Sequence, residues 1–148
     1  MTNQAPYTSI TLETLQSMVV EDLHMNRANI VDESIKTSSL FSKYLNILSK
    51  ERTILRGLTK QKEELEFSKY KFYTGKSDEP EVSPMRVLKA EADKYIGGDK
   101  DVMSLKGRIL VQQEKVDLLT EVVKHINSRS FTISNIIKAL QFENGIGG

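Results

Sequence analysis

Basic and aromatic side chains interleave between Lys60 and Lys76, and together they have the chemistry for holding a nucleic acid. Four of the ten aromatic residues fall within residues 67–73, with lysines on both sides. Single-stranded nucleic acid presents phosphates to cations and unstacked bases to aromatic rings, each stacked base contributing about 1–3 kcal/mol. The stretch therefore predicts a single-strand binding site, although we expect at least two of the four rings to anchor the helix end in the core.

The positive charge of the chain is concentrated in the same region. Residues 36–76 carry a net charge of +6, whereas residues 1–35 carry −4 and residues 77–148 carry −1. A single basic segment in an otherwise balanced chain usually faces a polyanion. A lysine-rich helix face that is merely solvated is the alternative on composition alone.

The common catalytic and metal-binding constellations are absent from the sequence. There is no cysteine, and the two histidines, His24 and His125, have no second histidine at ligand spacing. The sequence from Gly97 to Lys100 lacks the spacing of a phosphate-binding loop and reads as a helix boundary. Three glutamates beside the lysines look like intrahelical ion-pair partners: Glu63, Glu64 and Glu66. We expect no enzymatic activity, no metal and no cofactor.

Composition also indicates the cellular compartment in which the protein works. Without cysteine it forms no disulfide, and no apolar run approaches the roughly 18 residues of a membrane span. We expect an intracellular protein without a membrane contact.

The sequence predicts one helical domain with loose ends. Residues 1–9 read as a flexible tail, residues 10–145 as a single helical domain with a polar loop at 76–84, and residues 146–148 as a loose terminus.

Order is expected to begin near Ile10 or Thr11, and apolar residues at helical spacing from Leu12 to Leu23 predict a first helix. A long helix is predicted from about Ala28 to Phe72, or two helices that meet near Gly57. On the long helix one apolar stripe lies opposite a cationic side: the stripe is Leu40, Tyr44, Ile47, Leu48, Leu55, Leu58 and Leu65, and the cations are Arg52, Arg56, Lys60 and Lys71. Such a stripe must pack on other helices, of this chain or of further copies.

Beyond the loop, Ser83 and Pro84 predict the start of a short helix that ends before Gly97. Asp99 is placed to cap a second long helix, which we expect to break at residues 130–132 before a final helix ends near Gly145. No period-two alternation is present. The predicted fold class is all-α, with long amphipathic helices that form a helical hairpin or bundle element.

The sequence resembles the UvsY family of phage recombination mediators from about residue 12 to 76 and again from 99 to 145. The resemblance is carried by six short runs in order: residues 12–16, 42–46, 72–76, 99–102, 128–131 and 142–145.

The resemblance implies a non-enzymatic protein that assembles into a ring of identical subunits, six to eight in number, and binds single-stranded DNA. It also implies that the protein helps a RecA-like phage recombinase onto strands covered by the phage single-strand-binding protein, in the cytoplasm of the infected host cell.

The DNA-binding motif of the family reads approximately Leu-Lys-x-Arg-Leu-Asp-Tyr-Tyr-Ser-Gly, and residues 66–75 align with it. Lys69 keeps the second basic position, Phe67 occupies the first, and Lys71 stands where the family pattern has an acid. The candidate single-strand contacts are Arg56, Lys60, Lys62, Lys69, Lys71, Tyr73 and Lys76. The candidate oligomer contacts are Ile133, Ile136, Ile137 and Leu140.

Two other readings stay open from the residues alone. A structural or scaffold oligomer of a virion would have the same helices without DNA affinity. A duplex-DNA regulator is less favoured, because no short helix-turn-helix and no sustained basic zipper region is visible.

Overall fold

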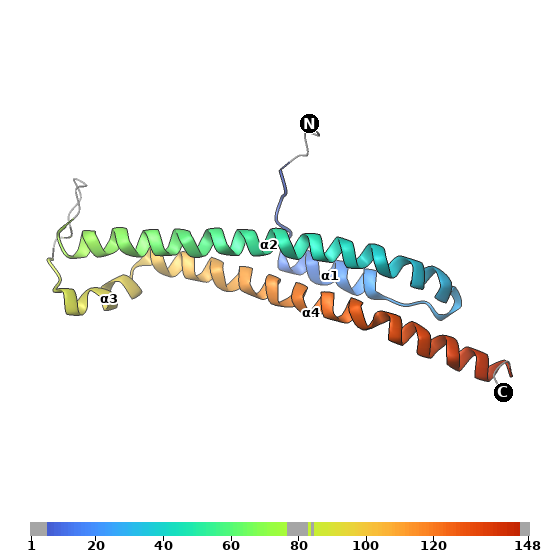
Figure 1. The fold of residues 1–148 in the computed structure, drawn as a ribbon. Helices are drawn as coiled ribbons and strands as arrows, with labels where there is room; N and C mark the ends of the chain where they lie inside the picture. Colours follow the sequence, from blue (N-terminus) through green and yellow to red (C-terminus); the bar gives the residue numbers. More distant parts are fainter. Residues whose placement is uncertain (1–5, 77–82, 84, 146–148) are drawn as a thin grey trace. The chain divides into compact units, whose positions relative to one another are not determined.

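The computed structural model describes residues 6–76, 83 and 85–145, and helices account for most of them (Figure 1). The order is α1 (Leu12–Leu23), a 3-10 turn η1 (Arg27–Asn29), α2 (Ile30–Tyr73), α3 (Lys89–Gly97) and α4 (Lys100–Glu143). The described residues contain no strand, and the predicted all-α class is confirmed. Parts of the predicted tail, loop and loose terminus lie outside the described residues, at 1–5, 77–82, 84 and 146–148.

Helix α2 is a single helix of 44 residues, so one of the two predicted alternatives is confirmed. Gly57 lies at its exposed surface, where a Cβ atom would have no neighbour within 4 Å. A mid-helix glycine costs up to about 1 kcal/mol relative to alanine, which the packing of the neighbouring turns outweighs. The predicted apolar stripe is buried or half-buried throughout.

The end of α2 is set by Gly75, whose φ of +73° favours a residue without a Cβ atom. The Gly75 amide donates to the Phe72 carbonyl at 3.2 Å, and the Lys76 amide donates to the Lys71 carbonyl at 2.8 Å. These two bonds form a Schellman cap and satisfy the last carbonyls of the helix.

The predicted start of the short helix at Ser83 and Pro84 is wrong. Helix α3 begins at Lys89, and the Ser83 hydroxyl donates to the Met85 carbonyl instead of capping a helix. The intervening segment returns to α2, because the amide of the buried Val87 donates to the Tyr73 carbonyl at 3.0 Å. A long-range pairing has therefore overridden a local capping signal.

The predicted break of the last helix at residues 130–132 is also wrong, since α4 runs unbroken from Lys100 to Glu143. The buried side chains of Arg129 and Ile133 lie one turn apart, before and after the expected break. Both are held inside the protein, while Phe131 points outward with 74% of its surface exposed. The tertiary contacts of Arg129 and Ile133 keep the weak helix formers at 130–132 helical.

The chain divides into two compact units. Unit 1 is Met1–Arg52 with Glu114–Gly148, and unit 2 is Thr53–Gln113. In unit 1, α1 packs on α2 through Asp22, which accepts hydrogen bonds from Lys43 and Tyr44. Its core is apolar: Leu15, Leu40, Tyr44, Leu48, Val116, Leu119, Val122, Ile126 and Ile133.

Unit 1 also buries two ion pairs between α2 and α4. The Lys115 ammonium lies 2.9 Å from the Glu51 carboxylate, which further accepts hydrogen bonds from Tyr7 and Ser9 of the N-terminal segment. The Arg129 guanidinium pairs with Glu33 in the same way. Because Glu51 pairs with Lys115 and Glu33 pairs with Arg129, the parts of α2 and α4 in this unit are antiparallel.

Candidate nucleic-acid interface

The second half of α2, in unit 2, carries the residues that the sequence predicts to bind a single strand, and the helix divides them between two faces. With 3.6 residues per turn, Arg56, Lys60 and Lys71 lie within about 60° of one another. Arg56 and Lys60 are exposed and Lys71 is partly exposed. We call these three residues and Phe67, which lies between them on the same face, the outer stripe.

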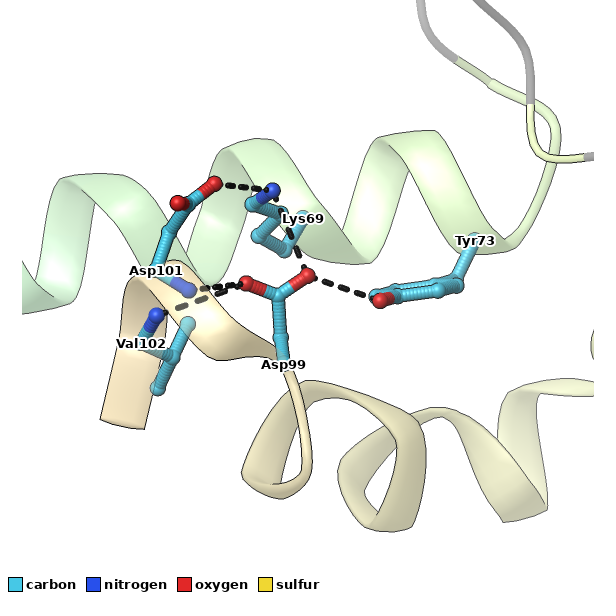
Figure 2. A network of polar contacts seen from close by, with 5 residues as sticks. All are labelled: Lys69, Tyr73, Asp99, Asp101 and Val102. Carbon is cyan, nitrogen blue, oxygen red and sulfur yellow. Dashed lines mark hydrogen bonds and ion pairs between the residues drawn. The ribbon is translucent and has the colours of Figure 1, made fainter. Parts of the chain in front are cut away.

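The other face turns toward α3 and α4, and it holds Lys69 and Tyr73. Figure 2 shows both side chains converging on Asp99, which directly precedes α4. The Lys69 ammonium lies 3.2 Å from the Asp99 carboxylate and 2.8 Å from that of Asp101. The Tyr73 hydroxyl donates to Asp99 at 2.7 Å. Only 22% of the Lys69 side chain is exposed.

Asp99 is the centre of this junction and also the cap of α4, as the sequence predicts. Its second carboxylate oxygen accepts hydrogen bonds from the backbone amides of Asp101, at 2.9 Å, and Val102, at 3.3 Å (Figure 2). These amides are donors that no carbonyl inside the helix can satisfy. The junction thus joins the end of α2 to the start of α4 through one carboxylate.

The charges of the junction are settled by these contacts. Burial by itself raises the pKa of Asp99, but the hydrogen bonds from Tyr73, Lys69 and the backbone amides outweigh it and hold that pKa below its usual value. The hydrogen bond to Asp101 raises the pKa of Lys69, despite partial burial. One ammonium between two carboxylates leaves the junction with a net charge of −1, which disfavours a phosphate.

An apolar cluster lies directly beneath the junction. Its buried members are Ala92, Ile96 and Val102, and Leu65, Tyr70 and Tyr73 pack against them. The expectation that at least two of the four rings anchor the helix end in the core is confirmed by the two tyrosines. The Tyr73 ring further contacts Tyr95, with 5.9 Å between ring centroids.

Two predicted lysines belong neither to the outer stripe nor to the contacts at Asp99. Lys62 is partly exposed on the side of α2 that Lys69 occupies, and Lys76 is exposed just beyond the helix. Sequence reasoning missed the exposed Arg86, whose Nε donates to the Thr74 carbonyl at 3.4 Å and whose side chain lies beside Gly75. Its place depends on the return of the chain after the loop, which no local pattern signals.

The candidate oligomer contacts are placed less uniformly than the sequence suggests. Ile133 is only 3% exposed and packs within unit 1, whereas 38% of Ile137 is exposed and Ile136 and Leu140 are partly exposed. Phe131 and Phe142, which sequence reasoning did not select, are 74% and 81% exposed.

Within the described part of the chain, no group of three or more histidines or carboxylates is arranged to hold a metal ion. The helices found there also include none that is long and apolar enough to cross a membrane.

Fold and surface together define an all-α protein that presents a row of cations to solvent, the class suited to a polyanionic partner. A family model described as "Recombination, repair and ssDNA binding protein UvsY" matches residues 18–146. The chain therefore belongs to the UvsY family, and the predicted family is confirmed.

Individual relatives agree with this assignment. The chain is 27% identical over 134 residues to the recombination protein uvsY of Enterobacteria phage T4, covering 90% of this chain and 98% of that protein. Two crystal structures of the bacteriophage T4 recombination mediator protein UvsY, in lattice types II and IV, superimpose with TM-scores of 0.84 and 0.83 at 26% identity. They cover 91% and 90% of this chain and 98% and 99% of the crystallised chains.

Proposed function

We propose that this protein is a recombination mediator without enzymatic activity of its own. As a ring-like homo-oligomer of six to eight subunits, it binds single-stranded DNA and loads a RecA-like phage recombinase onto strands covered by single-strand-binding protein. It acts in the cytoplasm of the infected host cell. The similar bacteriophage T4 protein is a recombination mediator, which supports this role.

The observation that carries DNA binding is the outer stripe of α2. Its cations are aligned, and 77% of the Lys60 side chain is exposed. The ion pair between Lys60 and Glu64 is long at 3.9 Å and solvent-exposed, so it holds Lys60 only weakly. The ammonium is therefore available to a phosphate. Repetition of the stripe on every subunit would bind one strand far more tightly than a single copy.

Two double variants with equal changes of net charge test the stripe. Lys60→Gln with Lys71→Gln removes two stripe cations, and Lys124→Gln with Lys138→Gln removes two exposed lysines of unit 1. We expect the first variant to bind an oligo(dT) strand more weakly, with a salt slope smaller by about 0.7 for each phosphate that it no longer neutralises. The second variant should retain most of the affinity of the wild type. Equal reductions in both would show that only net charge matters.

Loading is tested on a strand covered with single-strand-binding protein, by the lag before a RecA-like recombinase hydrolyses ATP. The wild type and the control variant should shorten the lag, and the stripe variant should not. The mediator alone should hydrolyse no ATP. A protein that binds the strand but leaves the lag unchanged would be a structural DNA-binding oligomer instead. The mass in solution, with and without oligonucleotide, gives the number of subunits.

A further inference from the structure

Phe67 is the most exposed of the four clustered rings in α2, with 62% of its surface accessible. The others are engaged: Tyr70 and Tyr73 pack on the apolar cluster, and Phe72 is half-buried with its ring 5.2 Å from that of Tyr73. A phenylalanine that is mostly exposed gains little from burial in the folded chain. Its ring is available to a partner.

Lys71 lies one turn beyond Phe67, and its ammonium is 4.7 Å from the centroid of the ring. This distance is within the roughly 6 Å over which a cation and an aromatic face attract. The pair presents a ring and a positive charge side by side on the outer stripe. Bases and phosphates of a single strand need these two groups in close succession.

The charges around the pair differ at its two ends. Glu63 and Glu64 lie one turn before Phe67 on the same side of the helix, and Lys71 lies one turn after it. Lys60 pairs with Glu64 only weakly, at 3.9 Å, so the two carboxylates still repel a phosphate at Phe67, whereas an uncharged base is not repelled. The surroundings therefore favour a base at Phe67 and a phosphate at Lys71.

Lys69, which the family motif aligns with a DNA contact, is in a different state. Its ammonium is held by Asp99 and Asp101 in a junction of net negative charge. A phosphate that approached this ammonium would meet two carboxylates, at 3.2 Å and 2.8 Å from the nitrogen. The motif position is thus occupied by a contact inside the chain, and the exposed pair lies on the neighbouring face.

We infer that Phe67 is a base-stacking platform for single-stranded DNA and that Lys71 binds the adjacent phosphate. The inference rests on the proposed function and deepens it: a ring stands where the family pattern has a cation, so this chain replaces one phosphate-binding side chain with a stacking one. Lys69 then acts as a positioning residue, which ties the end of α2 to the cap of α4.

The chain has no tryptophan, so Phe67→Trp creates a single fluorescent reporter at the platform. We expect oligo(dT) to quench this fluorophore at saturation, because a stacked base lies against the indole. The matched control is Phe131→Trp, another exposed ring replaced in unit 1, whose emission should change little. Binding without quenching at position 67, or equal quenching at both positions, would overturn the inference.

Stacking is separated from charge by a second series of variants and an abasic strand of equal length. Phe67→Ala and Phe67→Leu should weaken oligo(dT) binding at least about fivefold without altering the salt slope, and Phe67→Tyr should retain affinity. On the abasic strand, wild type and Phe67→Ala should bind alike. If the leucine variant binds as well as wild type, the ring does not stack.

The outcomes distinguish this inference from the proposed function. A wild type that binds neither strand contradicts the function itself. A wild type that binds oligo(dT) while Phe67→Ala binds equally well contradicts the platform alone. If Phe67→Ala instead changes the mass of the assembly, the ring belongs to a subunit contact and the platform is wrong.

Discussion

In unit 1 the Lys115 ammonium lies 2.9 Å from Glu51 with 6% of its side chain exposed, whereas in unit 2 the Lys60 side chain is 77% exposed. Both residues are lysines on long helices, and both have a glutamate within 4 Å. Burial makes the first pair part of the fold, and exposure leaves the second free to exchange its partner. The same residue type therefore has two roles, which only its surroundings distinguish.

Lys69 is an enclosed lysine like Lys115, although the family motif aligns it with a DNA contact, which would have to be exposed like Lys60. Its side chain is 22% exposed, and it has two carboxylate partners. The comparison of the two units thus predicts that charge removal is costly to stability where the cation is enclosed and nearly neutral where it is not.

The largest expected effect comes from breaking the most enclosed pair. Lys115→Met removes the ammonium that lies 2.9 Å from Glu51, whose side chain is only 1% exposed. We expect the free energy of unfolding, measured by urea denaturation, to fall by about 3–5 kcal/mol. Replacing both residues by leucine should cost less than the single change. A decrease below about 1 kcal/mol would show that the buried pair contributes little to the stability of the fold.

A smaller decrease is expected at the junction of unit 2. Asp99→Ala removes the cap of α4 and the shared acceptor of Lys69 and Tyr73. We expect a destabilisation of about 1–3 kcal/mol by thermal unfolding. Asp101→Ala, which removes only the 70% exposed partner of Lys69, should cost clearly less. Equal costs would contradict the central place of Asp99.

Acid should weaken the same junction. Because the pKa of Asp99 is lowered in the fold, its contribution to stability is complete above its ordinary pKa of about 3.9 and is lost as the pH falls through that value and the lower folded one. The urea midpoint of the wild type should therefore fall more steeply between pH 5 and pH 3 than that of Asp99→Asn. Parallel profiles for the two proteins would exclude the junction as a source of acid sensitivity.

The smallest effect is expected for an exposed ion pair in unit 1. Lys124 and Glu121 lie 2.8 Å apart, with 67% and 70% of their side chains exposed. Lys124→Ala should change the free energy of unfolding by less than about 0.5 kcal/mol. A larger change would mean that exposure is a poor guide to the role of a cation in this protein.

The sequence by itself determined the helices whose signals are local. The apolar period predicted α1 and the helical course of α2, with a break near Gly57 left open, and Asp99 was predicted as the cap of α4. Each signal depends on residues within a few turns of one another. The resemblance carried by short runs predicted the family, which the family model confirms.

Only the tertiary structure decided the start of α3 and the continuity of α4, since Val87 pairs with Tyr73 and Arg129 with Glu33 across long sequence separations. The tertiary structure also places Phe67 and Lys69 in different surroundings, although the sequence pattern put both in one basic and aromatic segment. Two residues apart on a helix, they point about 200° apart, so one ring faces solvent while one ammonium meets Asp99. Which cation is enclosed depends on the elements that pack beside it.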